Sequence, residues 1–359
     1  MSFQVIMQYV AVIGIAVGFI DSLLGDRMHV GEKFRSAYEM AGSMFLSMVG
    51  AMCLAPVIAS ILKAPVSAIC GKAGIDPSIL SIVLGTDMGG YPLAMSMAEN
   101  NTIATMHGTI TAAYFGGTIT FGLPLSIAVV RGKDFNLFAR GIIIGMIMIP
   151  FGSSLFGIFL GLTIAEILVN NLVILMLSLL FAVVFVLFPE RTGTAVNTFG
   201  KAIGNISIVC ISVGSIAHLL GKELPFGFTP VMDNMLVICG IIITLSGMLP
   251  IMLIFNRTFE KPLKRIGKLA GLDGVSVSGM LVTLVSCAPM LPMLHEMNDK
   301  GKIVNGMWLV LNAATFGSQM SYLMTTDPTV LFPFIVAKLI TGVIGLFIAR
   351  IYIRHLNME

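Results

Sequence analysis

Apolar residues form long runs along almost the whole chain, and only short polar gaps separate them. A helix that crosses a bilayer needs about 20 predominantly apolar residues. Runs of about this length recur from residue 4 to residue 353, and we count eleven: 4–24, 40–62, 77–97, 104–130, 141–164, 167–188, 202–221, 233–255, 275–294, 303–326 and 330–353. The pattern predicts an all-α polytopic membrane protein without room for a separate soluble domain.

Composition supports this prediction and excludes several functions. Of the 359 residues, 57% are hydrophobic and 11% are charged, whereas an ordinary soluble domain has about 25% charged residues. The net charge of +3 is small and its basic residues lie in separate gaps, which argues against a nucleic-acid partner. The five scattered cysteines form no metal motif, and the chain has no phosphate-binding loop, so we expect no cofactor and no metal.

The two halves of the chain match each other at an offset of 196 to 197 residues. The matches include residue types that an apolar composition would not align by chance: Gly50 with Gly247, Pro65 with Pro262, Asp76 with Asp273, Pro92 with Pro289, Glu99 with Glu296 and Asn101 with Asn298. We interpret this as a duplication. It predicts a first repeat at 1–165, a linking helix at 166–196 and a second repeat at 197–359.

The distribution of Lys and Arg indicates how the segments cross, because cytoplasmic loops are enriched in them. If all eleven segments cross, the bias between the two sides is weak. If 77–97 and 275–294 are instead re-entrant or broken, 17 basic residues lie inside and only Lys63, Lys72 and Lys222 outside, with Lys338 inside a helix. We therefore expect nine crossings, two hairpins, inverted repeats and a cytoplasmic C-terminus, a recurrent transporter plan.

The first of these hairpins contains the most site-like motif. Residues 85–92 read GTDMGGYP, and three glycines with a proline do not hold a continuous helix. Broken backbone deep in a membrane is tolerated only where protein, water or ligand satisfies it, and a carboxylate there is costly. We predict that Asp87 binds a cation, with Thr86, Gly89, Gly90 and Tyr91 around it. The alternative is that Asp87 caps a helix or pairs with Lys338.

The second hairpin and the segment after it add polar candidates. Ser286 lies in the matching tip, and Asn312, Ser318 and Gln319 follow. Asn312 and Gln319 are seven residues apart, so in a helix they share a face and present amide groups to a hydroxyl. Polar residues that hold helices together would look the same. Glu99 and Glu296 stand where the hairpins end, as gating or coupling groups or as solvated helix ends.

Several of these residues also carry a family resemblance. The run from Asp87 to Met95, DMGGYPLAM, followed by Met97-Ala98-Glu99, resembles the ethanolamine utilization protein EutH, and the likeness extends upstream through Gly25-Asp26-Arg27. The resemblance implies a multi-pass carrier of the bacterial cytoplasmic membrane that takes up ethanolamine. In this family an amide residue commonly precedes the aspartate, where this chain has Thr86.

Two other functions stay open at this level. A sodium- or proton-coupled antiporter of another small cation would also use a buried carboxylate such as Asp87. An intramembrane aspartyl protease would need a paired acid, for which Asp21 is only a weak candidate, so we expect no enzyme. The expected partners are ethanolamine and the lipid bilayer, and the sequence allows a homo-oligomer without requiring one.

Overall fold

The computed structural model describes residues 3–84, 89–269 and 271–356, and this part of the chain is helical without any strand. The described residues of each of the eleven predicted segments are mostly helical. Eight described helical spans are long and apolar enough to cross a membrane: Phe3–Leu23, Val30–Ala73, Asn101–Val129, Gly132–Phe159, Ile164–Leu187, Pro189–Leu219, Val231–Arg265 and Pro328–His355. The predicted all-α polytopic fold is confirmed.

The chain divides into two compact units, and each takes residues from both halves of the sequence. Unit 1 comprises 1–42, 126–145 and 237–359, and unit 2 comprises 43–125 and 146–236. These units differ from the predicted repeats, because a repeat is defined by matching sequence and a unit by contacts. The duplication therefore stays a prediction at this point.

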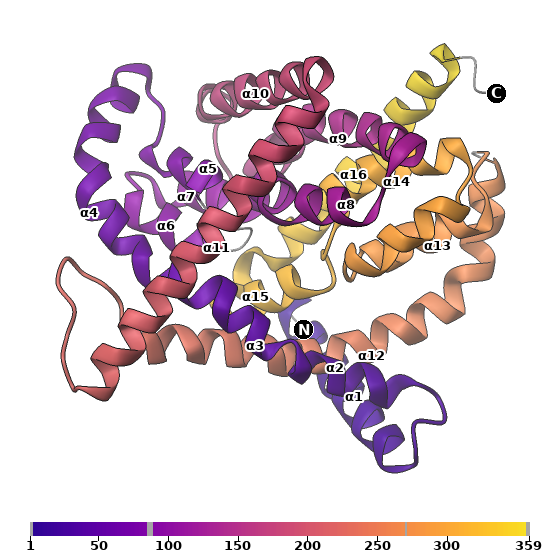
Figure 1. Ribbon diagram of the computed structural model, residues 1–359, viewed down its shortest axis with the longest axis horizontal. Coiled ribbons are helices and arrows are strands. Elements are labelled where there is room, and N and C mark those ends of the chain that lie inside the picture. Colours follow the sequence, from indigo (N-terminus) through magenta and orange to yellow (C-terminus); the bar gives the residue numbers. More distant parts are fainter. Residues whose placement is uncertain (1–2, 85–88, 270, 357–359) are drawn as a thin grey trace. The chain divides into compact units, whose positions relative to one another are not determined.

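Unit 1 is built on close helix contacts. Its elements, some shared with unit 2, are α1 (Phe3–Leu23), α2 (Val30–Glu39), α8 (Leu123–Val129), α9 (Gly132–Phe159), α12 (Val231–Leu269), α13 (Gly274–Thr283), η7 (Ala288–Glu296), α14 (Asp299–Asn312), α15 (Ser318–Thr326), η8 (Pro328–Val330) and α16 (Leu331–His355). Both α13 and α16 pack on α14 (Figure 1). A Cβ at Gly141 would lie 1.9 Å from the carbonyl oxygen of Ile303. Small residues thus let α9 and α14 touch, as in other membrane proteins.

Unit 2 contains the first hairpin and a π-helical stretch. Besides the parts of α8, α9 and α12 that lie in this unit, its elements are α3 (Ala41–Met44), η1 (Phe45–Val49), α4 (Gly50–Cys70), η2 (Gly71–Ala73), η3 (Pro77–Ile79), α5 (Leu80–Leu84), α6 (Gly90–Met97), α7 (Asn101–Met106), η5 (His107–Gly116), η6 (Thr118–Gly122), α10 (Ile164–Leu187) and α11 (Pro189–Leu219). The Thr111 hydroxyl donates to the Met106 carbonyl five residues back, at 3.1 Å. All ten residues of η5 are buried.

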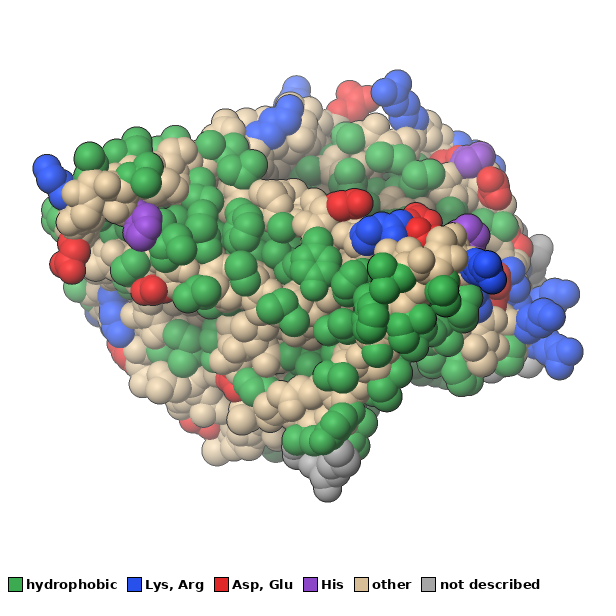
Figure 2. All heavy atoms as spheres, turned by 90° about the horizontal axis from the view of Figure 1, so that it is seen from below, with side chains coloured by type: hydrophobic (Ala, Val, Ile, Leu, Met, Phe, Trp, Pro, Cys, Tyr) green, Lys and Arg blue, Asp and Glu red, His purple; other side chains and the backbone are tan. Residues whose placement is uncertain are grey.

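Large apolar side chains cover the outer surfaces of the helices. On α10, Leu168, Leu172, Met176 and Leu180 recur every four residues and are 55–64% exposed. Figure 2 shows many hydrophobic side chains at the surface, with fewer charged ones among them. Such patches are not stable in water, and a bilayer is the solvent that accommodates them. The chain is a multi-pass membrane protein.

Candidate functional site

The first hairpin, residues 77–97, begins and ends at the carboxylate of Asp76. Its Oδ1 accepts the backbone N–H of Ser78 at 2.9 Å, and its Oδ2 accepts those of Glu99 at 3.1 Å and Asn100 at 2.7 Å. A continuous helix would place the ends of 21 residues roughly 30 Å apart at about 1.5 Å per residue. Because one buried carboxylate binds both ends, the segment folds back on itself.

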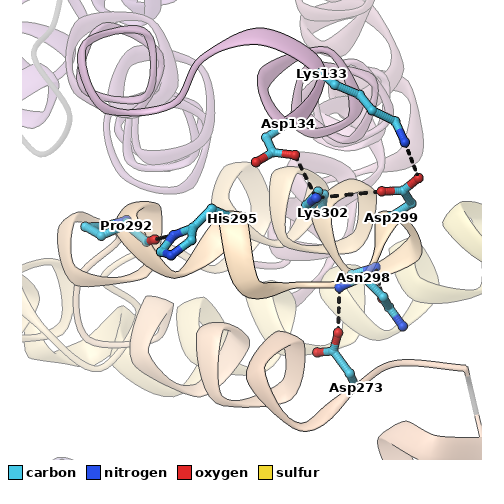
Figure 3. Close-up of polar contacts among 9 residues, drawn as sticks. Lys133, Asp134, Asp273, Pro292, His295, Asn298, Asp299 and Lys302 are labelled. Carbon is cyan, nitrogen blue, oxygen red and sulfur yellow. Dashed lines mark hydrogen bonds and ion pairs between the residues drawn. The ribbon is translucent and has the colours of Figure 1, made fainter.

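The second hairpin, residues 275–294, is closed in the same way by Asp273. Its Oδ1 accepts the backbone N–H of Ser276 at 2.7 Å. Its Oδ2 accepts that of Asn298 at 2.5 Å (Figure 3). The two arms, α13 and η7, pack against each other. We call Asp76 and Asp273 the closing aspartates. The sequence matched them only as a repeated residue type, without assigning them a role.

In unit 1 the second hairpin meets another interrupted helix. After α14 ends at Asn312, the backbone N–H of Ala314 donates to Thr283 O at 3.0 Å and that of Phe316 to Leu284 O at 2.8 Å. A Cβ at Gly317 would lie 2.1 Å from Val285 O. We call these residues, 283–285 with 313–317, the backbone crossing. The carbonyl groups at the C-terminal end of α13 have no partner within that helix, and they accept hydrogen bonds from the backbone between α14 and α15 instead.

The backbone crossing corrects one prediction. Asn312 and Gln319 do not share a helix face, because α14 ends at Asn312, Ala314 has a positive φ of 55°, and α15 starts only at Ser318. Segment 303–326, predicted as an ordinary crossing, is therefore broken. This is why the described chain has eight long apolar spans where nine were expected.

The predicted substrate-binding residues of unit 1, Ser286, Asn312, Ser318 and Gln319, all lie beside the backbone crossing in the chain. The Asn312 side chain is fully buried, and neither its Oδ1 nor its Nδ2 has a hydrogen-bond partner among the described residues. Gln319 is also buried, and its Oε1 accepts the Lys338 ammonium group at 2.6 Å. Ser286 and Ser318 are half-buried. An unpaired buried amide costs about 1–3 kcal/mol, which makes Asn312 a ligand candidate.

The predicted residues of the first hairpin are only partly described. Asp87 and Thr86 lie outside the described residues. Gly89 and Gly90 are buried at the start of α6, and Tyr91 is half-buried in its first turn. A Cβ at Gly108 would lie 2.8 Å from Tyr91 Cα, so η5 packs directly on this turn and fixes its position.

Glu99 and Glu296 both lie at the end of a hairpin, as predicted from their matching positions. Both side chains are exposed, and Glu296 Oε1 lies 3.6 Å from His295 Nε2. The exposure of both side chains is consistent with the interpretation as solvated helix ends. Their roles in gating or coupling stay predictions.

A network of charges surrounds the base of the second hairpin (Figure 3). Lys302, in the first turn of α14, donates to Asp134 Oδ1 at 2.7 Å and lies 3.6 Å from Asp299 Oδ1. Lys133 donates to the other oxygen of Asp299 at 3.0 Å. The Lys302 side chain is only 9% exposed. The network ties α9 to α14 at the end where Asp273 closes the hairpin.

Sequence reasoning missed the contacts of Lys338 with Gln319 and Ala313, because it treated this lysine only as a possible partner of Asp87. The signal was a lysine inside the apolar run 330–353. It also paired Asn101 with Asn298, whereas the residues that cap the helices after the hairpins are Asn100 and Asn298. The one-residue difference arises because Met297 separates Glu296 from Asn298, whereas Asn100 follows Glu99 directly.

Comparison with known proteins gives one consistent family. Residues 3–352 match the family model described as ethanolamine utilisation protein, EutH. A probable ethanolamine permease EutH of Listeria monocytogenes is 31% identical over 355 residues, covering 98% of this chain and 95% of the relative. The uncharacterized protein YxeR of Bacillus subtilis is 31% identical over 91% of this chain and 88% of its own length. No solved structure matches.

The similarity extends to enteric bacteria. A probable ethanolamine permease EutH of Salmonella typhimurium is 29% identical over 348 residues, 90% of this chain and 85% of the relative. These matches run through both compact units, so the similarity concerns the whole membrane domain and not one motif.

Proposed function

Because the chain belongs to the EutH family of ethanolamine utilisation proteins, we propose that it carries ethanolamine across the bacterial cytoplasmic membrane and that Asp87 binds the ammonium group. The family and the helical membrane fold point to a transporter rather than an enzyme. Ethanolamine is largely an ammonium ion at neutral pH, and an ion crosses hydrocarbon poorly. A carrier must therefore replace the water around the ammonium group of ethanolamine with fixed polar groups of the protein.

The observation that carries the proposal is the buried amide of Asn312 beside the backbone crossing, which has no hydrogen-bond partner among the described residues. A hydroxyl both donates and accepts, and a primary amide does the same, so Asn312 suits the hydroxyl end of an amino alcohol. Interrupted helices at membrane depth recur at the binding sites of transporters. Ser286, Ser318 and Gln319 are the further candidates beside this amide.

The two closing aspartates support the duplication in the same proposal. Each caps the start of a hairpin and binds the backbone after its end, and each hairpin is followed by an asparagine-capped helix. A duplicated ancestor would leave this repeated arrangement. We propose that the first hairpin, 77–97, and the second, 275–294, are re-entrant.

Uptake of radiolabelled ethanolamine into proteoliposomes tests the role of Asp87. We expect Asp87→Asn to abolish saturable uptake, because a neutral amide does not balance the ammonium charge. Asp233→Asn, at an exposed position in the first turn of α12, is the matched control and should transport normally. Unchanged affinity in Asp87→Asn would refute this role. Sodium and pH gradients in the same assay separate a facilitator from a coupled carrier.

A further inference from the structure

α16 carries a lysine well inside its apolar length. Lys338 is fully buried, with 0% of its surface exposed. It lies seven residues after the first residue of α16, or about 10 Å along the axis at about 1.5 Å per residue. An ionisable side chain at such a depth is costly and marks a functional position more often than a structural one.

The surroundings of the Lys338 ammonium group resemble a binding site for an organic cation. The group donates to Gln319 Oε1 at 2.6 Å and to Ala313 O at 3.3 Å, and it lies 5.4 Å from the centre of the Phe334 ring. Oxygen acceptors and an aromatic face are the groups that bind ammonium ions. Ala313 follows the last residue of α14, so the helix break places its carbonyl here.

The side chain held there has the same chemistry as the proposed substrate. Lysine ends in a primary ammonium group on a methylene chain, and so does ethanolamine in its charged form. Two like charges within a few Å of each other repel strongly in a poorly solvated site. They would therefore occupy these acceptors in turn.

We propose that Lys338 is a tethered cation that competes with the substrate's ammonium group for Gln319 Oε1, Ala313 O and the Phe334 ring, at a stage of the transport cycle other than the one in which Asp87 binds that group. Substrate binding at this place displaces Lys338, and the return of Lys338 helps to expel the substrate. The inference rests on the proposed function and adds to it a residue that sets affinity and release. Lys338 is a positioning residue of the transport cycle in this account.

Lys338→Met tests the proposal, because methionine keeps much of the volume and removes the charge. Without the competitor, we expect the Kd for radiolabelled ethanolamine to fall about tenfold and turnover to fall as well, because release slows. If Lys338 has only a structural role, Lys338→Met should leave the Kd unchanged or raise it, and it should lower thermal stability. Lys302→Met, which removes another buried lysine, is the control and should leave the Kd unchanged.

A second measurement uses the wild-type chain in liposomes and does not depend on a variant that folds. Reductive methylation followed by mass spectrometry reports the accessibility of each lysine amine. Because ethanolamine is itself a primary amine and consumes the aldehyde, the reagent is kept in large excess and the readout is the ratio of Lys338 to Lys302 methylation. Ethanolamine should raise this ratio. An unchanged ratio, or a Lys338→Met variant that folds and binds with an unchanged or raised Kd, would overturn the tethered cation while the permease stands. If the wild-type chain does not bind ethanolamine, both proposals are wrong.

Discussion

Replacing the closing aspartate Asp76 should loosen the first hairpin more than any exposed substitution would. Its buried carboxylate accepts three backbone N–H groups, from Ser78, Glu99 and Asn100. Loss of an N-cap costs about 1 kcal/mol, and each hydrogen bond to a charged acceptor contributes about 1.5–3 kcal/mol. The bonds from Glu99 and Asn100 are half-buried, so we take about 1.5 kcal/mol for each of them and add about 1 kcal/mol for the helix cap. Asp76→Ala should therefore destabilise the fold by about 4 kcal/mol.

The assay is reversible unfolding of the purified chain in mixed micelles, together with ethanolamine uptake. Asp76→Asn keeps one acceptor oxygen, which can bind either the N–H group at the start of the hairpin or those after its end. We therefore expect it to lose about half as much stability as Asp76→Ala. Asp233→Ala, at an exposed position in α12, should change stability by less than about 0.5 kcal/mol. A loss below about 1 kcal/mol in Asp76→Ala would show that the carboxylate does not hold the hairpin closed.

Two further predictions concern the second hairpin. Gly317→Ala places a Cβ 2.1 Å from Val285 O, so it should lower the free energy of unfolding by about 2 kcal/mol or more. Gly71→Ala, with open space around it, is the control and should not destabilise the fold. Equal unfolding midpoints for the two variants would contradict the close contact. Burial raises the pKa of the Asp273 carboxyl, but hydrogen bonds from Ser276 and Asn298 outweigh it and hold the pKa below its ordinary value. The native state thus binds this proton more weakly than the unfolded state, so the stabilisation is complete above about pH 4–5 and is lost as pH falls through the folded pKa. Asp273→Asn should flatten this acid limb of the stability profile, and an unchanged limb would refute the assignment.

The long helices could be predicted from the sequence because a bilayer imposes a simple rule. Each crossing needs a continuous apolar run, and α10, for example, was placed within three residues of its observed start. The first hairpin was also predictable, since its glycines and Pro92 break a helix. The prediction that this segment folds back on itself depended on the count of basic residues. The hydrogen bonds of Asp76 to both ends of the segment now support it.

The break between α14 and α15 could not be read from the sequence. Residues 313–317, AATFG, contain no proline and a single glycine, and their composition suits a helix. What interrupts them is the tertiary pairing of Ala314 and Phe316 with the end of α13. The contacts of Lys338 depend on the same break, because Ala313 O becomes available only where the helix stops. A rule based on local propensity does not include such long-range contacts.

The most direct test of the account is counterflow of radiolabelled ethanolamine in proteoliposomes that contain only this protein. Vesicles preloaded with unlabelled ethanolamine should accumulate the label transiently, and external ethanolamine should suppress this accumulation in a saturable way. Ethylene glycol, which lacks the ammonium group, should not suppress it. Folded protein that gives no counterflow, or counterflow that ethylene glycol suppresses equally well, would contradict a carrier that recognises ethanolamine by its charge.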